Sequence, residues 1–238
     1  MDGYHPSKTT WMNPNIEYLF NTDIIEYDIQ DAGYSLICQY KLLPSKQINE
    51  LEQIGKGTKR HIAIGMLQRD DKEFSKRLTD KFTEIRTLFL HNNNLTDNDI
   101  ISVKKDAIYT IGSCKKTSFG KVKFRPKAQY SSYIRFSQIQ NIELYFGSGI
   151  DVKGMSDSSV MKHNLYWMEF FRELFPMIES RNPRVKRWIM QFINKYKAGE
   201  LDDEYYVEFN NGSRKIDKLH NFQKVIVPVL QIIHREVI

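Results

Sequence analysis

The chain has 238 residues and a mass of 28.2 kDa, which is enough for one large domain or two small ones. Hydrophobic residues make up 41% and charged residues 27%, so the composition excludes a fibrous or wholly disordered chain. The 35 basic and 29 acidic residues give a net charge of +6, which is compatible with a polyanionic partner. No apolar run is long enough to span a membrane, and residues 1–14 do not resemble a leader, so we expect a cytoplasmic protein without a membrane partner.

The cysteine and histidine spacing indicates no metal site of the zinc type. Cys38 and Cys114 lie far apart in the sequence, and the six histidines are scattered. We therefore expect two reduced thiols and no structural zinc.

Hydrophobic periodicity and turn residues predict both strands and helices along the chain. After a flexible arm over residues 1–15, the pattern predicts strands at 24–29, 100–104, 107–111, 121–124, 130–136 and 142–146. It predicts helices at 31–40, 45–54, 70–92, 163–175, 184–197 and, interrupted by Pro228, 217–238. These elements predict an α+β fold, with a small antiparallel sheet and packed helices over 16–155 and a helical C-terminal region over 156–238.

The helix over 70–92 has the clearest amphipathic pattern. Its apolar residues recur every three or four positions, which predicts a stripe that packs in the core. The stripe consists of Phe74, Leu78, Phe82, Ile85 and Phe89.

Two aspartates stand where strands end, in settings that suit metal binding. Asp28 comes at the end of an apolar strand, and Asp106 lies between the two short strands of a hairpin. Carboxylates from a strand end and a neighbouring hairpin can converge on divalent ions, and their hard oxygens suit Mg²⁺ or Mn²⁺. Two such ions about 4 Å apart activate a hydroxyl group and stabilise a leaving oxygen. We therefore predict that Asp28 and Asp106 are metal ligands and catalytic residues.

The residues around these aspartates resemble motifs of template-dependent DNA polymerases. Residues 27–37 (YDIQDAGYSLI) are similar to the first palm motif of family B, and Gly33 stands near that motif's steric-gate tyrosine. The hairpin around Asp106 resembles the second metal-binding motif of family B and, less closely, of family A. Family B has two aspartates there, whereas Lys105-Asp106-Ala107 has one, so a protein partner could complete the site.

Basic residues after the hairpin continue the resemblance to family B in the same order along the chain. Residues 126–130 are similar to a lysine- and tyrosine-containing strand, and Lys153-Gly154 resembles the Lys-Gly pair that follows it. The resemblance implies a palm-like domain, with Lys127, Tyr130 and Lys153 in contact with the primer or template backbone. It covers about residues 24–155 and indicates a phage or mobile-element protein.

Other basic residues are candidates for contact with phosphate. The segment 115–125 interleaves cations with aromatic residues, as in surfaces that neutralise phosphates and stack bases, and an amphipathic strand with solvated lysines is the alternative. The predicted nucleic-acid contacts are Lys105, Lys121, Lys123, Arg125, Lys127, Tyr130 and Lys153, and the predicted nucleotide contacts are Lys59 and Arg60. The basic helix at 184–197 is interpreted as a core helix with a solvated basic face.

Three functions remain open from the sequence. The first is a palm-like protein that binds nucleic acid, with DNA favoured over RNA. It would be a metal-dependent nucleotidyltransferase that extends a primer with Mg²⁺ or Mn²⁺. The second is a non-catalytic phage protein that binds nucleic acid or a host protein, in which Asp28 caps a helix and Asp106 is a turn residue. The third is a nuclease that uses the same two carboxylates.

Overall fold

The computed structural model describes residues 3–136, 142–155 and 167–206, and residues 227, 230, 231, 233 and 234. Contacts divide the chain into two compact units. Unit 1 comprises Met1–Pro14 and Ile24–Gln129, and unit 2 comprises Asn15–Asp23 and Tyr130–Ile238. The predicted boundary near residue 156 lies outside the described residues, so the predicted domain division stays a prediction.

Unit 1 contains an antiparallel sheet in the order β1-β4-β5-β3-β7. The antiparallel pairs β1–β4, β4–β5 and β3–β5 have continuous registers apart from one shift between Ile100 and Ser102. Strand β7 runs through both units, and only its first half belongs to unit 1. The strands of this unit are β1 (Thr10–Met12), β3 (Ile24–Ile29), β4 (Ile100–Lys104), β5 (Ala107–Ile111), the short β6 (Ser118–Phe119) and β7 (Val122–Phe136).

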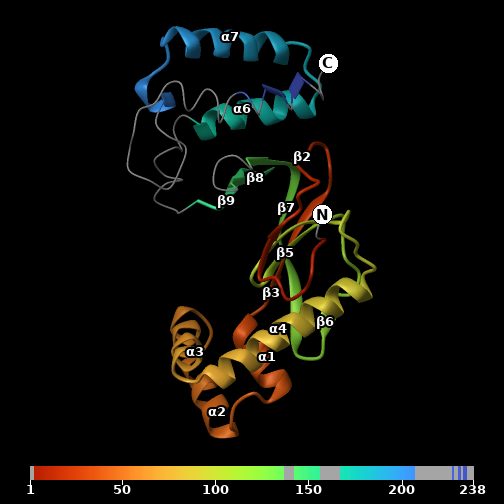
Figure 1. The fold of residues 1–238 in the computed structure, drawn as a ribbon, viewed down its shortest axis with the longest axis vertical. Coiled ribbons are helices and arrows are strands. Elements are labelled where there is room, and N and C mark those ends of the chain that lie inside the picture. The colour runs from red at the N-terminus through yellow and green to blue at the C-terminus, as the bar shows by residue number, and fades with distance from the viewer. Residues whose placement is uncertain are drawn as a thin grey trace. The chain divides into compact units, whose positions relative to one another are not determined.

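Four helices follow β3 and bury side chains in the same hydrophobic core as the strands. They are α1 (Ala32–Tyr40), α2 (Ser45–Ile54), α3 (Thr58–Asp70) and α4 (Lys72–Asn92). Helix α4 runs alongside the sheet, whereas α2 and α3 lie beyond its end (Figure 1). The side chain of Asp71 caps α4 by accepting a hydrogen bond from the backbone N–H of Phe74 over 2.9 Å. The amphipathic stripe of α4 is buried except for the partly buried Phe82, so the prediction of a core helix is confirmed.

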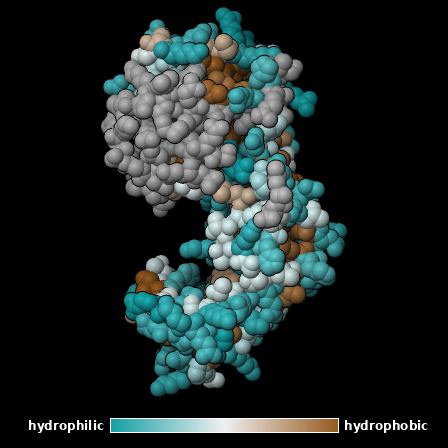
Figure 2. Space-filling model, viewed as in Figure 1, coloured by the Kyte–Doolittle hydropathy of each residue, from teal (hydrophilic) through white to brown (hydrophobic). Residues whose placement is uncertain are grey.

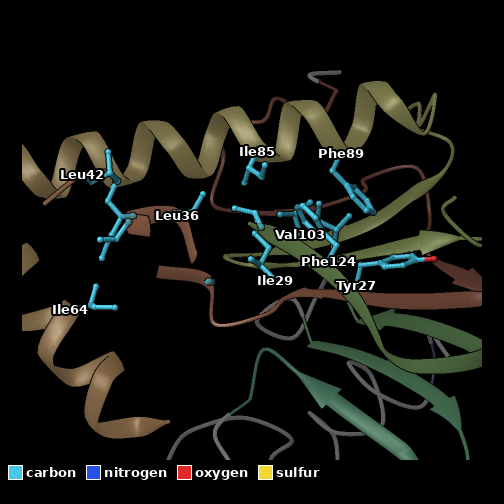
Figure 3. Close-up of a cluster of buried hydrophobic side chains, with 14 of the residues drawn as sticks. Tyr27, Ile29, Leu36, Leu42, Ile64, Ile85, Phe89, Val103 and Phe124 are labelled. Atoms are coloured by element: carbon cyan, nitrogen blue, oxygen red, sulfur yellow. The ribbon is translucent and has the colours of Figure 1, made fainter. Parts of the chain in front are cut away.

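Aromatic packing joins α4 to the sheet. Figure 3 shows Phe89 and Ile85 reaching from α4 toward Tyr27 and Phe124 of the strands. The rings of Phe89 and Phe124 are stacked with centroids 4.2 Å apart, and Tyr27 lies 5.4 Å from Phe89. Because each buried side chain of this size stabilises the fold by about 1.5–3 kcal/mol, this cluster holds β3 and β7 firmly against α4.

Unit 2 combines the second half of β7 with further strands and two helices. The antiparallel pairs β2–β7, β7–β8 and β8–β9 form its sheet. Trp167, Phe171 and Phe175 of α6 are fully buried and form the centre of its core. The elements are β2 (Tyr18–Leu19), β8 (Ile142–Gly147), β9 (Ile150–Lys153), α6 (Trp167–Glu179), α7 (Val185–Ala198) and the 3₁₀ turn η1 (Asp203–Tyr206).

The α+β prediction is confirmed, and most predicted elements lie within a few residues of those observed. Helix α3 was not predicted, because its side chains depart from the usual pattern: Arg60 is buried, whereas Ile62 and Met66 are exposed. The two strands predicted at 121–124 and 130–136 are one strand, β7, which continues through Pro126. The predicted arm contains β1, which pairs with β4 and buries Trp11. The helix predicted at 217–238 lies largely outside the described residues.

The interpretation of Asp28 as a helix cap is wrong. Asp28 lies within β3, and the N-cap of α1 is Asp31, whose backbone has φ of 51° and whose side chain makes no capping hydrogen bond. The turn of the β4–β5 hairpin places the positive φ of 53° on Lys105 rather than on Asp106.

Candidate active site

The two aspartates predicted to bind metal come together in unit 1. Asp28 of β3 stands opposite Ala107 of β5 in the antiparallel register. Next to this pair, the backbone N–H of Ile29 donates a hydrogen bond to the carbonyl oxygen of Asp106 over 3.1 Å. The sheet register therefore fixes Asp106, at the hairpin turn, beside the end of β3.

Burial and charge raise the pKa of Asp28 above its ordinary value. Desolvation is the main cause, and the negative charges of Asp106 and Glu26 add to it. Lys127 and Arg125 act in the opposite direction and lower the pKa. The Asp28 carboxylate thus lies among negative charges that the nearby cations balance only in part.

Strand alternation explains why Glu26 belongs to the same cluster. Tyr27 and Ile29 are buried in the core beneath the helices, so Glu26 and Asp28 lie on the opposite face of β3. Glu26 is nearly inaccessible to solvent, with 2% exposure of its side chain, and accepts a hydrogen bond from Lys127 Nζ over 2.8 Å. The structure therefore adds Glu26 to the site, and the alternation of residues 24–29 was the signal that could have identified it.

Strand β7 carries a row of cations beside these carboxylates. Lys123, Arg125 and Lys127 are exposed and alternate with the buried Val122 and Phe124. The hydrogen bond with Glu26 raises the pKa of Lys127, and the charges of Glu26, Asp28 and Asp106 add to this effect. Three of the predicted nucleic-acid contacts thus lie on one face of one strand, and two of them act electrostatically on Asp28.

The carboxylates of Asp28 and Asp106 are open to a ligand. Within the described part of the chain, neither carboxylate makes a hydrogen bond or an ion pair with another residue. The same residues include no group of three or more His, Cys, Asp or Glu side chains that could hold a metal ion. Two carboxylates still suit Mg²⁺, which keeps several waters and binds through one or two carboxylates together with substrate phosphates.

A cavity of about 400 Å³ lies next to Asp106 within unit 1. Gly33 of α1 and His61 of α3 contribute to its wall, together with Phe82 and Lys105. The position that resembles the steric-gate residue therefore lines a cavity beside one of the two aspartates.

Lys59 and Arg60, the predicted nucleotide contacts, have different surroundings. Lys59 is exposed in the first turn of α3. Arg60 is 3% exposed, forms an ion pair with Asp31, and lies over the ring of Tyr34 at 4.0 Å from its centroid. His61 Nε2 is 3.7 Å from the same Asp31 carboxylate. The described contacts of Arg60 are internal, and sequence reasoning missed this ion pair because no spacing rule links 31 and 60.

The other predicted nucleic-acid contacts lie at the hairpin turn, beside a second cavity of unit 1, and in unit 2. Lys105 is exposed at the hairpin turn, and its carbonyl oxygen accepts a hydrogen bond from Arg86 over 3.0 Å. Lys121 and Lys123 line a cavity of about 380 Å³. In unit 2, Tyr130 donates a hydrogen bond to the Asp151 carboxylate, and Lys153 lies on β9. The predicted roles of these residues stay predictions.

The family comparison covers nearly the whole chain. A family model described as bacteriophage PBS1 gene 130 protein matches residues 3–234. The chain belongs to this family. No curated protein matches the chain.

Membership of a bacteriophage family agrees with the phage part of the sequence-based prediction. The family description names no activity, and it indicates no relationship to polymerases. No helix among the described residues is long and apolar enough to cross a membrane. An assignment of function therefore depends on the chemistry of the site.

Proposed function

We propose that this phage-family chain is a palm-like protein that binds nucleic acid and transfers nucleotides to a primer end. The observation that carries the proposal is that Asp28, near the end of β3, lies beside Asp106, in the turn of the β4–β5 hairpin, and next to the cations of β7. The hairpin with Asp106 lies next to β3, in keeping with the resemblance of these two segments to the metal-binding palm motifs of family B. The absence of hydrogen bonds to either carboxylate from the described residues leaves both available for a metal ion.

In the proposed reaction, the primer 3′-oxygen forms a bond to the α-phosphorus of a nucleotide while the bond to the pyrophosphate oxygen breaks. Asp28 and Asp106 would hold Mg²⁺ or Mn²⁺, which supplies activation of the hydroxyl and neutralisation of phosphate charge. Arg125 and Lys127 would balance the charge of the nucleic-acid backbone. Catalysis would then come from positioning and electrostatic stabilisation.

Primer extension tests this proposal. Purified protein is incubated with a labelled primer–template, all four deoxynucleotides, and Mg²⁺ or Mn²⁺, and the products are sized on a gel. We expect extension that Asp28→Asn abolishes. Asp80→Asn is a matched control, because Asp80 is an exposed residue of α4 outside the cluster of Glu26, Asp28 and Asp106. Shortened products that depend on Asp28 would instead establish the nuclease, and an unchanged primer in both metals would contradict catalysis.

A non-catalytic nucleic-acid-binding protein is the second candidate. It is favoured by the row of exposed cations on β7, Lys123, Arg125 and Lys127, which suits contact with phosphate without any metal ion. In this case a gel shift occurs without extension. Asp28→Asn and Asp106→Asn would then keep or tighten binding, since each removes a negative charge from the surface that contacts phosphate.

The finer points of the sequence-based prediction remain proposals. The resemblance to DNA polymerases favours DNA over RNA, and a phage protein of this kind would act in the cytoplasm of the host cell. A partner protein could complete the metal site. Helix α3 exposes Ile62 and Met66, and these side chains give such a partner an apolar surface to contact. Figure 2 shows a hydrophobic patch in the region where Figure 1 draws α3.

A further inference from the structure

Helix α7 of unit 2 carries positive charge without any negative charge of its own. The segment from 181 to 199 has six basic residues and no acidic ones. Its buried side chains are Val185, Ile189, Ile193 and Tyr196, which fix the helix against the core. All six basic residues are exposed, namely Arg181, Arg184, Lys186, Arg187, Lys195 and Lys197.

Most of these cations have no ionic partner among the described residues. Within the described residues, the side chains of Arg181, Arg184, Lys186, Arg187 and Lys195 make no hydrogen bond or ion pair. A solvated face that only keeps the protein in solution ordinarily mixes charges of both signs. A face of one sign, by contrast, attracts a polyanion and releases the counterions of its phosphates.

An aromatic cavity of about 540 Å³ adjoins this cationic face. The rings of Phe170, Trp188, Phe192 and Tyr205 line it. Trp188 is stacked on Phe170 at 5.3 Å and on Phe192 at 6.1 Å, with interplanar angles of 24° and 18°. In Figure 2, a hydrophobic patch interrupts the hydrophilic surface at the end of unit 2 where Figure 1 draws α6 and α7.

Polar groups at the cavity distinguish where a phosphate and a base would lie. Lys195 and Asn194 line the side formed by α7, whereas Glu169 and Glu173 line the side formed by α6. The two carboxylates repel phosphate but accept hydrogen bonds from the N–H groups on a base edge. Arg187 and Lys195 are eight residues apart, so the helix separates them by about 12 Å, enough to contact two different phosphates of one strand.

We propose that α7 and this aromatic cavity bind single-stranded nucleic acid, with the backbone along Arg187 and Lys195 and an unpaired base against Trp188. A paired base cannot enter the cavity without leaving its stack, so the site selects single strands over duplex. The inference rests on the proposed function only in that the partner is nucleic acid, because the site involves neither Asp28 nor Asp106.

Fluorescence anisotropy with a labelled single-stranded oligodeoxynucleotide, measured with the full-length protein over a range of salt concentrations, tests the site. Arg187→Ala combined with Lys195→Ala should lower affinity at least tenfold and flatten the salt dependence, by about 0.7 in log–log slope for each cation. Trp188→Leu should lower affinity about tenfold and leave that slope unchanged. The matched control is Lys46→Ala with Lys76→Ala, which removes the same charge from exposed positions of unit 1.

An equal loss in the control pair would overturn the proposal, as would duplex binding as tight as single-strand binding. Photocrosslinking of the unaltered protein to an iodouridine oligonucleotide covers the case in which Trp188→Leu does not fold. Crosslinks should fall on Trp188 or Tyr205, and crosslinks confined to unit 1 would refute the site. Asp28→Asn with Asp106→Asn should keep this binding, so a failure of nucleotidyl transfer leaves the present proposal intact.

Discussion

The buried ion pair between Arg60 and Asp31 offers a direct test of what Arg60 does. The Arg60 side chain is 3% exposed and that of Asp31 is 12% exposed, so solvent screens the pair weakly. The guanidinium also lies over the ring of Tyr34. Replacing Arg60 by Met keeps the apolar stem that packs between α1 and α3 but removes the charge.

The expected cost follows from the burial of the two charges. Removing one partner of a buried ion pair costs about 3–5 kcal/mol, because the other charge is left without compensation. Asp31 retains slight exposure and has His61 Nε2 at 3.7 Å, so the lower figure of about 3 kcal/mol applies. With a urea m-value of about 1.5 kcal/mol/M, the unfolding midpoint of unit 1 should fall by about 2 M.

Urea unfolding followed by pulsed hydrogen exchange measures this change, since peptides from 32–40 and 58–70 report on unit 1 alone. Asp31→Asn combined with Arg60→Met should be less destabilising than the sum of the single changes. Lys59→Met is the control, because Lys59 is the exposed neighbour on the same helix and should change stability by less than about 0.5 kcal/mol. A midpoint for Arg60→Met within 0.3 M of the unaltered protein, roughly the shift allowed to the control, would refute the structural role and leave the predicted nucleotide contact of Arg60 as the alternative.

Three further changes test other parts of the structure. Asp28→Asn should stabilise unit 1 at pH 7, because burial and the charge of Asp106 raise the pKa of Asp28 in the folded state and so make its ionised form costly. This gain should disappear as the pH falls below the ordinary pKa of aspartate, and urea unfolding at pH 7 and pH 3 measures it. Phe89→Ala should cost about 3–5 kcal/mol in the same assay, whereas Leu88→Ala, at a 37% exposed neighbouring position, should cost much less. Asp71→Ala should cost about 1 kcal/mol and increase exchange in the first turn of α4, because it removes the cap of Phe74 N–H.

Local patterns in the sequence predicted the elements of unit 1 that follow simple rules. The hairpin was predicted at 100–104 and 107–111, and β4 and β5 have these bounds. Both strands are short β-prone runs on either side of a two-residue turn, so neighbouring residues suffice to determine them. The stripe of α4 was predicted for a similar reason, since residues three and four apart share one face of a helix.

Helix α3 could not be predicted because its environment reverses the usual pattern. Arg60 is buried through a partner that lies 29 residues earlier, and no local rule identifies Asp31 as that partner. Ile62 and Met66 are exposed although they are apolar. Periodicity assumes that burial follows polarity, and here a long-range ion pair overrides this relation.

In the candidate site, too, some features follow from neighbouring residues and others depend on contacts between distant segments. Asp28 and Asp106 could be chosen from the sequence because each stands at a strand end, but their proximity depends on the register of β3 with β5, which tertiary pairing determines. Glu26 enters the cluster through strand alternation, and Lys127 enters it because β7 lies on the other side of β3. One antiparallel sheet thus brings three acidic and two basic side chains from three separate segments into electrostatic contact. A protein with only a structural use for Asp28 would gain stability by replacing it, so the cost of keeping this partly buried charge beside Asp106 is itself a reason to test the site for metal-dependent chemistry.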